Sequence, residues 1–182
     1  MRPRKPPTPL DENALYAYAV RLLGQQMRTV TELKRLLRRR IEPGESGQTA
    51  LDAVIARLTE HRYLDDTGYA LDYARLRQEN SSFGRRRVQQ DLMRKGVHAE
   101  VIAKTLDTAY EGVGEEALAR RHLARKRIAQ PKTDKDAARI VRLLLRAGFS
   151  TSTIVRILKK WNVDEAAITA LESTAADEPS ES

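Results

Sequence analysis

The sequence predicts an all-α protein, built as an elongated and curved tandem array of three three-helix repeats that resemble helix-turn-helix units. Apolar residues recur at spacings of three and four throughout the chain, as they do on the buried face of an amphipathic helix. No run of four to eight residues alternates apolar and polar side chains in the manner of a strand. The pair Gly96-Val97 recurs 52 residues later as Gly148-Phe149, together with the leucines and isoleucines around it. An internal period of this size indicates stacked units rather than one irregular globule.

A third, less regular copy precedes these two. Leu33 and Leu37 match Val88 and Leu92 at an offset of 55 residues. In place of the glycine, this copy carries a turn-rich insertion at residues 42–47. We therefore expect three units of three helices each.

The chain ends differ in composition from the middle. Residues 1–12 are rich in proline and basic side chains, and residues 172–182 are small, polar and acidic, so we expect both to be disordered tails. The expected boundaries of the repeats are 13–64, 65–112 and 113–171, the last with an additional terminal helix.

Capping residues predict where several helices begin. Thr29-Val30-Thr31-Glu32 has the form of a capping box, which opens the helix that carries Leu33 and Leu37. Either Asp65 or Asp66 is expected to cap the helix that carries Tyr69 and Tyr73.

Glycine and proline predict where helices end. Gly96 and Gly148 each fall just after a leucine-bearing helix, where a left-handed residue is favoured. Ser150 then caps the next helix, with Phe149 beside it at the staple position. Pro131 is expected to close a helix that runs over residues 115–129.

Composition limits the possible functions. The chain has 33 lysines and arginines against 25 acidic residues, a net charge of +8 that favours polyanionic partners. It has no cysteine, its three histidines share no metal-ligand spacing, and neither glycine-rich phosphate-loop pattern occurs. We therefore expect no catalytic residue, no cofactor and no metal. No apolar run is long enough to cross a membrane, so we expect a cytoplasmic protein.

Arginines fall on the outward face of the middle helix in each repeat, as a helical wheel at about 100° per residue places them. One repeat position, two residues after the repeat leucine, is arginine in all three copies: Arg39, Arg94 and Arg146. If the repeats stack with a constant rotation, these side chains form a ladder that suits phosphates or an acidic protein groove. Charged stripes are also the usual solvated face of a helix. The candidate binding residues are Arg35, Arg38, Arg39, Arg86, Arg87, Arg94, Arg142 and Arg146.

An ordered set of motifs resembles a known family. The run from Tyr63 to Arg77 has the form Tyr-Leu-Asp-Asp-x-x-Tyr-Ala-x-x-Tyr-x-x-x-Arg, and Gly84, Lys95-Gly96 and Gly148-Phe149 follow in order. Together they resemble the RecX family of bacterial recombination regulators. The signature positions, which we interpret as mainly structural, are Asp65, Asp66, Tyr69, Tyr73, Arg77, Gly84, Lys95, Gly96, Gly148 and Phe149.

The resemblance implies a non-catalytic protein that binds the filament of the RecA recombinase. Such a protein lodges in the groove of the nucleoprotein filament and inhibits recombinase, ATPase and co-protease activity, which modulates recombinational DNA repair and the SOS response. The resemblance also implies weak, non-specific binding of single- and double-stranded DNA. It implies neither a membrane partner nor a small-molecule substrate.

Two other functions stay open. A helix-turn-helix DNA-binding regulator would need base-reading side chains at the start of one helix, typically Arg, Gln or Asn. The helices after the glycines begin instead with residues 98–100, His-Ala-Glu, and 150–152, Ser-Thr-Ser. The other possibility is a helical-repeat adaptor that makes no contact with nucleic acid.

Overall fold

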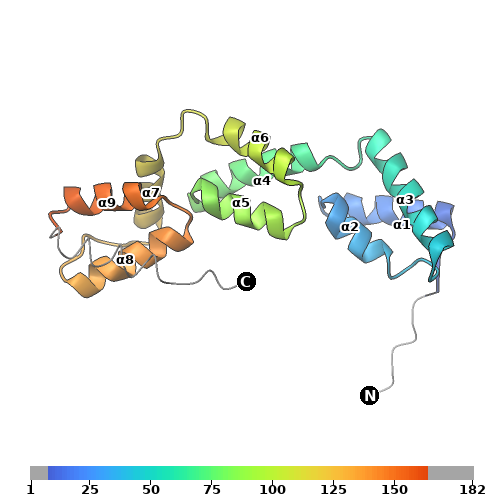
Figure 1. The fold of residues 1–182 in the computed structure, drawn as a ribbon, viewed down its shortest axis with the longest axis horizontal. Helices are drawn as coiled ribbons and strands as arrows, with labels where there is room; N and C mark the ends of the chain where they lie inside the picture. Colours follow the sequence, from blue (N-terminus) through green and yellow to red (C-terminus); the bar gives the residue numbers. More distant parts are fainter. Residues whose placement is uncertain (1–7, 164–182) are drawn as a thin grey trace, which may run out of the picture. The chain divides into compact units, whose positions relative to one another are not determined.

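The computed structural model describes residues 8–163, and within them it contains nine α-helices and no β-strand (Figure 1). The all-α prediction is confirmed. The acidic tail, residues 1–7 of the N-terminal tail and the expected helix beyond residue 163 lie outside the described residues. The helices are α1 (Glu12–Gln25), α2 (Val30–Leu37), α3 (Glu45–Glu60), α4 (Asp66–Ser81), α5 (Arg85–Arg94), α6 (Ala99–Tyr110), α7 (Glu115–Arg125), α8 (Asp134–Arg146) and α9 (Thr151–Lys160).

The chain divides into two compact units. Unit 1 comprises residues 1–72 and 92–105, and unit 2 comprises residues 73–91 and 106–182. The division passes through α4, α5 and α6, so the middle three helices contribute to both units. The compact units therefore do not coincide with the expected repeats, whose boundaries stay a prediction.

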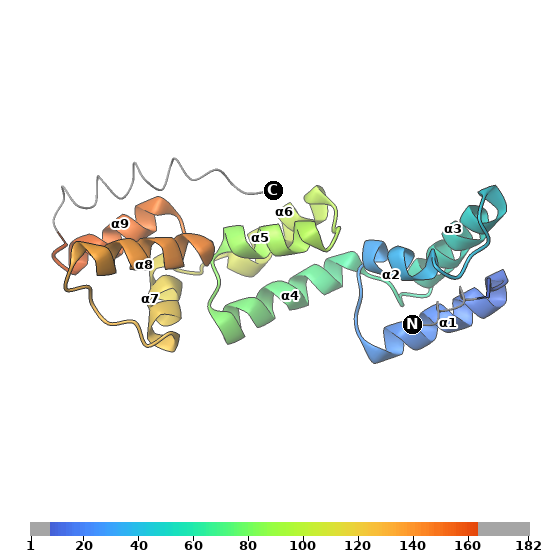
Figure 2. The ribbon, with the colours of Figure 1, turned by 90° about the horizontal axis from the view of Figure 1, so that it is seen from below.

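In unit 1, helices α1, α2 and α3 pack against one another, as the two ribbon views show (Figures 1 and 2). Their core contains the fully buried Leu15, Leu33 and Leu51. The Asp11 carboxylate accepts a hydrogen bond from the Ala14 amide and caps α1, which therefore begins one residue before the expected boundary. The capping box predicted at the start of α2 is confirmed.

In unit 2, helix α9 packs against both α7 and α8 (Figure 2). Phe149 and Leu144 are buried at the centre of this core. The Glu115 carboxylate, at the start of α7, accepts hydrogen bonds from the Ser150 amide and the Thr153 hydroxyl. Burial alone would raise the pKa of Glu115, but the hydrogen bonds from Ser150 and Thr153 outweigh it and lower the pKa. Ser150 caps α9 as predicted.

Helix α7 ends earlier than predicted. The last helical residue is Arg125, so the interpretation of Pro131 as the helix terminator is wrong. Arg127 adopts a left-handed conformation with φ 54°, and the Ile128 amide donates to the Leu123 carbonyl over 3.0 Å. This is a Schellman ending, and it is accompanied by packing of Ile128 against the core of unit 2. A tertiary contact thus ends the helix before the proline.

A glycine turn joins neighbouring sets of helices in unit 1. Gly96 has φ +75° and follows α5, as predicted. The hydroxyl of Thr31 donates to the Gly96 carbonyl over 2.9 Å, and the hydroxyl of Thr29 donates to the Lys95 carbonyl over 2.6 Å. Lys95 also pairs with the Glu32 carboxylate over 3.0 Å. The turn between α5 and α6 is therefore docked on the N-terminus of α2, and we call this contact the first joint.

The same arrangement recurs in unit 2. Gly148 has φ +86° and follows α8, and the Gly84 amide donates to the Ala147 carbonyl over 2.8 Å. A Cβ atom on Gly148 would overlap the backbone nitrogen of Arg87, and one on Gly84 would overlap the carbonyl of Gly148. The turn between α8 and α9 is therefore docked on the N-terminus of α5. This second joint allows only glycine at both contact positions.

The turn between α2 and α3 has a different construction. In this turn the amide of Leu10, which precedes α1, donates to the Arg40 carbonyl over 2.7 Å. Gly44 has φ +107°, yet nothing lies within 4 Å of where its Cβ would be. Gly44 therefore lacks the close backbone approach that surrounds Gly148.

The second joint predicts that Gly148→Ala destabilises the protein much more than Gly112→Ala. Both glycines are left-handed, so both substitutions add a backbone cost of about 1–2 kcal/mol. Only Gly148 has no room for a methyl group, since Gly112 has nothing within 4 Å. We expect the free energy of unfolding, measured by urea titration, to fall by at least about 2 kcal/mol more for Gly148→Ala. Equal losses in the two variants would contradict the joint.

Candidate anion-binding site

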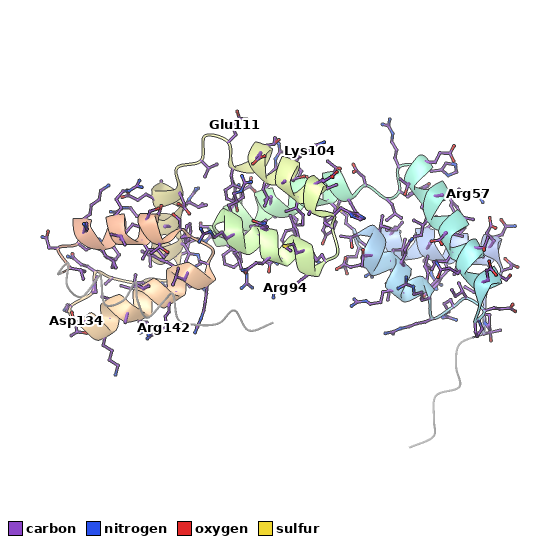
Figure 3. The ribbon with its side chains drawn as sticks, viewed as in Figure 1. Arg57, Arg94, Lys104, Glu111, Asp134 and Arg142 are labelled. Atoms are coloured by element: carbon purple, nitrogen blue, oxygen red, sulfur yellow. The ribbon has the colours of Figure 1, made fainter. Side chains whose placement is uncertain are left out.

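Seven of the eight candidate arginines are exposed, and Arg87 is half-buried. Figure 3 marks Arg94 at the end of α5 and Arg142 on α8. The candidate arginines form three groups by helix: in or just after α2 lie Arg35, Arg38 and Arg39, on α5 lie Arg86, Arg87 and Arg94, and on α8 lie Arg142 and Arg146.

The three arginines of the expected ladder occupy similar local positions. Arg94 and Arg146 are the last residues of α5 and α8, and Arg39 lies two residues after the end of α2. Arg39 and Arg94 belong to unit 1, whereas Arg146 belongs to unit 2. The alignment of the three side chains along one side of the array therefore stays a prediction.

Unit 2 contains a cavity of about 360 Å³ between residues of α5, α7 and α8 and the segment before α5. No carboxylate of residues 8–163 lines it. Five of its lining side chains are basic, and they are Arg87, Lys126, Arg139, Arg142 and Arg146. We call it the basic cavity. The remaining wall is formed by His122 and the apolar residues Phe83, Leu143 and Ala147.

Local structure explains how these basic residues converge. Arg139, Arg142 and Arg146 lie three and four residues apart on α8, so they share one face of that helix. The second joint brings the start of α5, with Arg87, against the end of α8. Lys126 is the C-cap of α7, where the helix ends early.

Few of these cations have an ion-pair partner among the described residues, although Arg139 is near enough to Asp136 to help lower the pKa of that carboxyl. Arg87 Nε lies 3.3 Å from Asp91 Oδ1, which makes an ion pair without hydrogen-bond geometry. Within residues 8–163, the other four basic side chains of the cavity make no hydrogen bond or ion pair, namely Lys126, Arg139, Arg142 and Arg146. An anion such as a phosphate group would supply the missing partner, since guanidinium groups bind phosphate oxygens through charge-assisted hydrogen bonds.

His122 lines the basic cavity and is buried, with 3% of its surface exposed. Its Nδ1 donates to the Ser81 carbonyl over 2.8 Å, and its ring packs between Phe83 and Phe149. Burial lowers the pKa of the imidazole, and the charge of Lys126 lowers it further. His122 is therefore neutral near pH 7.

Sequence reasoning found three of the five basic residues of the cavity and missed two. Arg139 lies three residues before Arg142, and that spacing could have identified it. Lys126 could not be found this way, because the sequence predicts that α7 continues past it. For His122 the sequence indicates only that it shares no metal-ligand spacing with the other two histidines. Within residues 8–163, no group of three or more metal-ligating side chains is close enough to hold an ion.

Asp65 and Asp66, the adjacent signature aspartates, have different partners. Asp65 caps α4, because its carboxylate accepts hydrogen bonds from the amides of Thr67 and Gly68. The Asp66 carboxylate instead accepts from the Val30 amide over 2.9 Å, at the start of α2. Burial raises the pKa of Asp66, and the hydrogen bond from Val30 opposes this. Both roles are structural.

Other signature residues also serve the fold. Lys95 Nζ lies 5.5 Å from the centroid of the Tyr69 ring, beside the first joint. The Tyr73 hydroxyl donates to Asp91 over 3.2 Å, and the Arg77 guanidinium lies 4.8 Å from the centroid of the Tyr73 ring. These contacts position α4 and α5 rather than form a catalytic group.

Residues 8–163 include no helix that is long and apolar enough to span a membrane.

The buried His122 predicts a pH dependence of stability. Its pKa is lower in the folded protein than in the unfolded chain, so the unfolded chain binds more protons as the pH falls. The contribution of neutral His122 to the free energy of unfolding is fully present above about pH 6.5, the pKa of a histidine in the unfolded chain, and is lost progressively below that pH. Urea unfolding at about pH 7.5 and about pH 5.5 should show a smaller loss for His122→Gln than for the wild type. An identical loss in both proteins would argue against a buried neutral imidazole.

Comparison with known proteins places these features in a family. The model of the RecX second three-helix domain matches residues 65–106. The regulatory protein RecX of Mycolicibacterium smegmatis is 36% identical over 138 residues, which cover 73% of this chain and 71% of that protein. RecX of Myxococcus xanthus is 34% identical over 171 residues, which cover 86% and 88%.

A solved structure agrees in fold. The crystal structure of RecX from Lactobacillus salivarius superposes with a TM-score of 0.64 at 23% identity, over 84% of this chain and 97% of that one. Both relatives that match most of this chain are named as regulatory proteins. The chain belongs to the RecX family.

Proposed function

We propose that this chain is a non-catalytic regulator that binds the RecA nucleoprotein filament. It inhibits recombinase, ATPase and co-protease activity, and so modulates recombinational DNA repair and the SOS response. Family membership supports this function. The observation that carries the mode of contact is the basic cavity, a space of about 360 Å³ that five basic side chains and no carboxylate of the described residues line.

The chemistry of the cavity suits the phosphates of the DNA inside the filament. Arg142 and Arg146 present planar guanidinium groups that can each donate two parallel hydrogen bonds to a phosphate. Five basic groups in one cavity repel one another, and bound phosphates remove that repulsion while they release counterions from the DNA. Binding of this kind does not depend on base sequence. It accounts for weak, non-specific affinity for single- and double-stranded DNA.

The exposed arginines of unit 1 extend the contact. Within the described part of the chain, no hydrogen bond or ion pair engages the side chains of Arg35, Arg38 and Arg39, so these side chains are available to phosphates or to acidic side chains of RecA. Arg86 adds a further exposed cation on α5. A protein with several separate basic contacts suits a long polymeric target better than a single short ligand.

The geometry weighs against the alternative of a helix-turn-helix DNA-binding regulator. At the start of α9, Ser150 and Thr153 hydrogen-bond to Glu115 within the protein, and the exposed side chains are the short hydroxyls of residues 151–152. The first turn of α6 carries the exposed Glu100, whose carboxylate repels phosphate. Neither helix presents base-reading side chains at its N-terminus.

The proposal predicts that Arg142→Glu with Arg146→Glu raises the concentration needed to inhibit the DNA-dependent ATPase of RecA at least about tenfold. Two reversed charges in the cavity repel phosphates instead of binding them. The matched control is Arg121→Glu with Arg156→Glu, which changes the same charge at exposed positions of unit 2 outside the cavity. The control should inhibit as the wild type does, and circular dichroism should show native helicity in both variants.

Full inhibition by the cavity variant would discard the basic cavity as the contact site. An inability of the wild type to bind RecA or DNA at low salt would instead favour the adaptor without nucleic-acid contact.

A further inference from the structure

We infer that the acidic C-terminal segment, residues 172–182, binds in the basic cavity when no polyanion is present. The segment thereby competes with phosphate-bearing partners and sets a threshold for their binding. Only the identity of the competitor rests on the proposed function. The contact between the segment and the cavity is inferred from their opposite charges, from the length of chain that joins them and from the residues that line the cavity.

The charges of the two parts are complementary. The segment carries Glu172, Asp177, Glu178 and Glu181, and no lysine or arginine occurs in the sequence after Lys160. Among residues 8–163, four basic side chains of the cavity make no hydrogen bond or ion pair, and no acidic side chain lines the cavity. Carboxylates and guanidinium groups form paired hydrogen bonds of the same geometry as phosphates and guanidinium groups do. The segment can therefore satisfy the same groups as a phosphate backbone.

The described chain ends near a second cavity that adjoins the basic cavity. The Gln130 side chain donates to the Trp161 carbonyl over 2.7 Å, just after α9. Gln130 lines a second cavity of about 300 Å³, which shares Arg139 and Leu143 with the basic cavity. From Val163 to Glu172 an extended chain spans at most about 30 Å, since each residue adds about 3.3–3.6 Å. The second cavity and the basic cavity share two lining side chains, so a chain of this length can carry the carboxylates from one to the other.

The tether makes such a contact effective yet reversible. A short connection between a cavity and its ligand raises the effective concentration of the ligand, to about millimolar in favourable cases. Ion pairs on an exposed surface are individually weak and are screened by salt. A polymer with many phosphates can thus displace the segment, whereas a small anion at low concentration cannot.

The contact can be measured without any nucleic acid. Lys126 is the one lysine among the described residues that line the basic cavity, so a zero-length carbodiimide should link its amine to carboxylates of residues 172–182 in the protein with all 182 residues. Lys135 provides the control, because it is exposed in the same unit and lines neither cavity. Peptide mass spectrometry should find links to Lys126 several-fold more often than links to Lys135. High salt should remove the excess.

Equal linking of the two lysines, or no link to the segment, would overturn the inference. The inference would also be overturned if the excess of links at Lys126 persisted after Arg139, Arg142 and Arg146 were replaced by serine.

A second measurement tests the competition. The full-length variant with Glu172→Gln, Asp177→Asn, Glu178→Gln and Glu181→Gln should bind a labelled single-stranded oligonucleotide about tenfold more tightly than the wild type at low salt. Equal affinities would overturn the competition. If neither protein binds the oligonucleotide, the proposed function fails, and the linking experiment still decides whether the segment occupies the cavity.

Discussion

The close approach of a left-handed glycine turn to the N-terminus of another helix is the constraint on which this structure depends. At the second joint, the backbones of Gly84 and Gly148 come so close that neither residue can carry a side chain. At the first joint, Gly96 approaches Thr31 in the same way, and a Cβ on the glycine would lie 2.5 Å from the threonine side chain. Each joint lies within one compact unit, so the two joints define the units better than the repeats do.

The second joint also assembles the candidate site. Arg87 lies where the turn contacts α5, and Arg146 is the last residue of α8 before that turn. Both side chains line the basic cavity, and so does Ala147, whose carbonyl accepts the hydrogen bond from Gly84. The residues that hold the fold together are thus neighbours of those that give the cavity its charge. A change in the joint would alter the spacing of the basic groups without removing any of them.

The sequence predicts the features of the fold that depend on local chemistry, but it does not predict those that depend on tertiary contacts. The helical class, the caps at Thr29 and Ser150 and the left-handed glycines follow from spacing and residue type. The early end of α7 follows from packing of Ile128 into the core, which no local pattern reveals. The convergence of residues from three helices on one cavity depends on the joint itself. For that reason the sequence could identify arginines of the site one by one, but neither Lys126 nor the cavity.

The salt dependence of DNA binding tests the central claim most directly, because it counts phosphates in contact. For single strands, the logarithm of the binding constant falls against the logarithm of salt concentration with a slope of about −0.7 per phosphate. Replacing Arg139, Arg142 and Arg146 by serine should therefore make the slope for an oligonucleotide shallower by about 2. Parallel slopes for this variant and the wild type would show that phosphates do not enter the basic cavity, and would contradict the account.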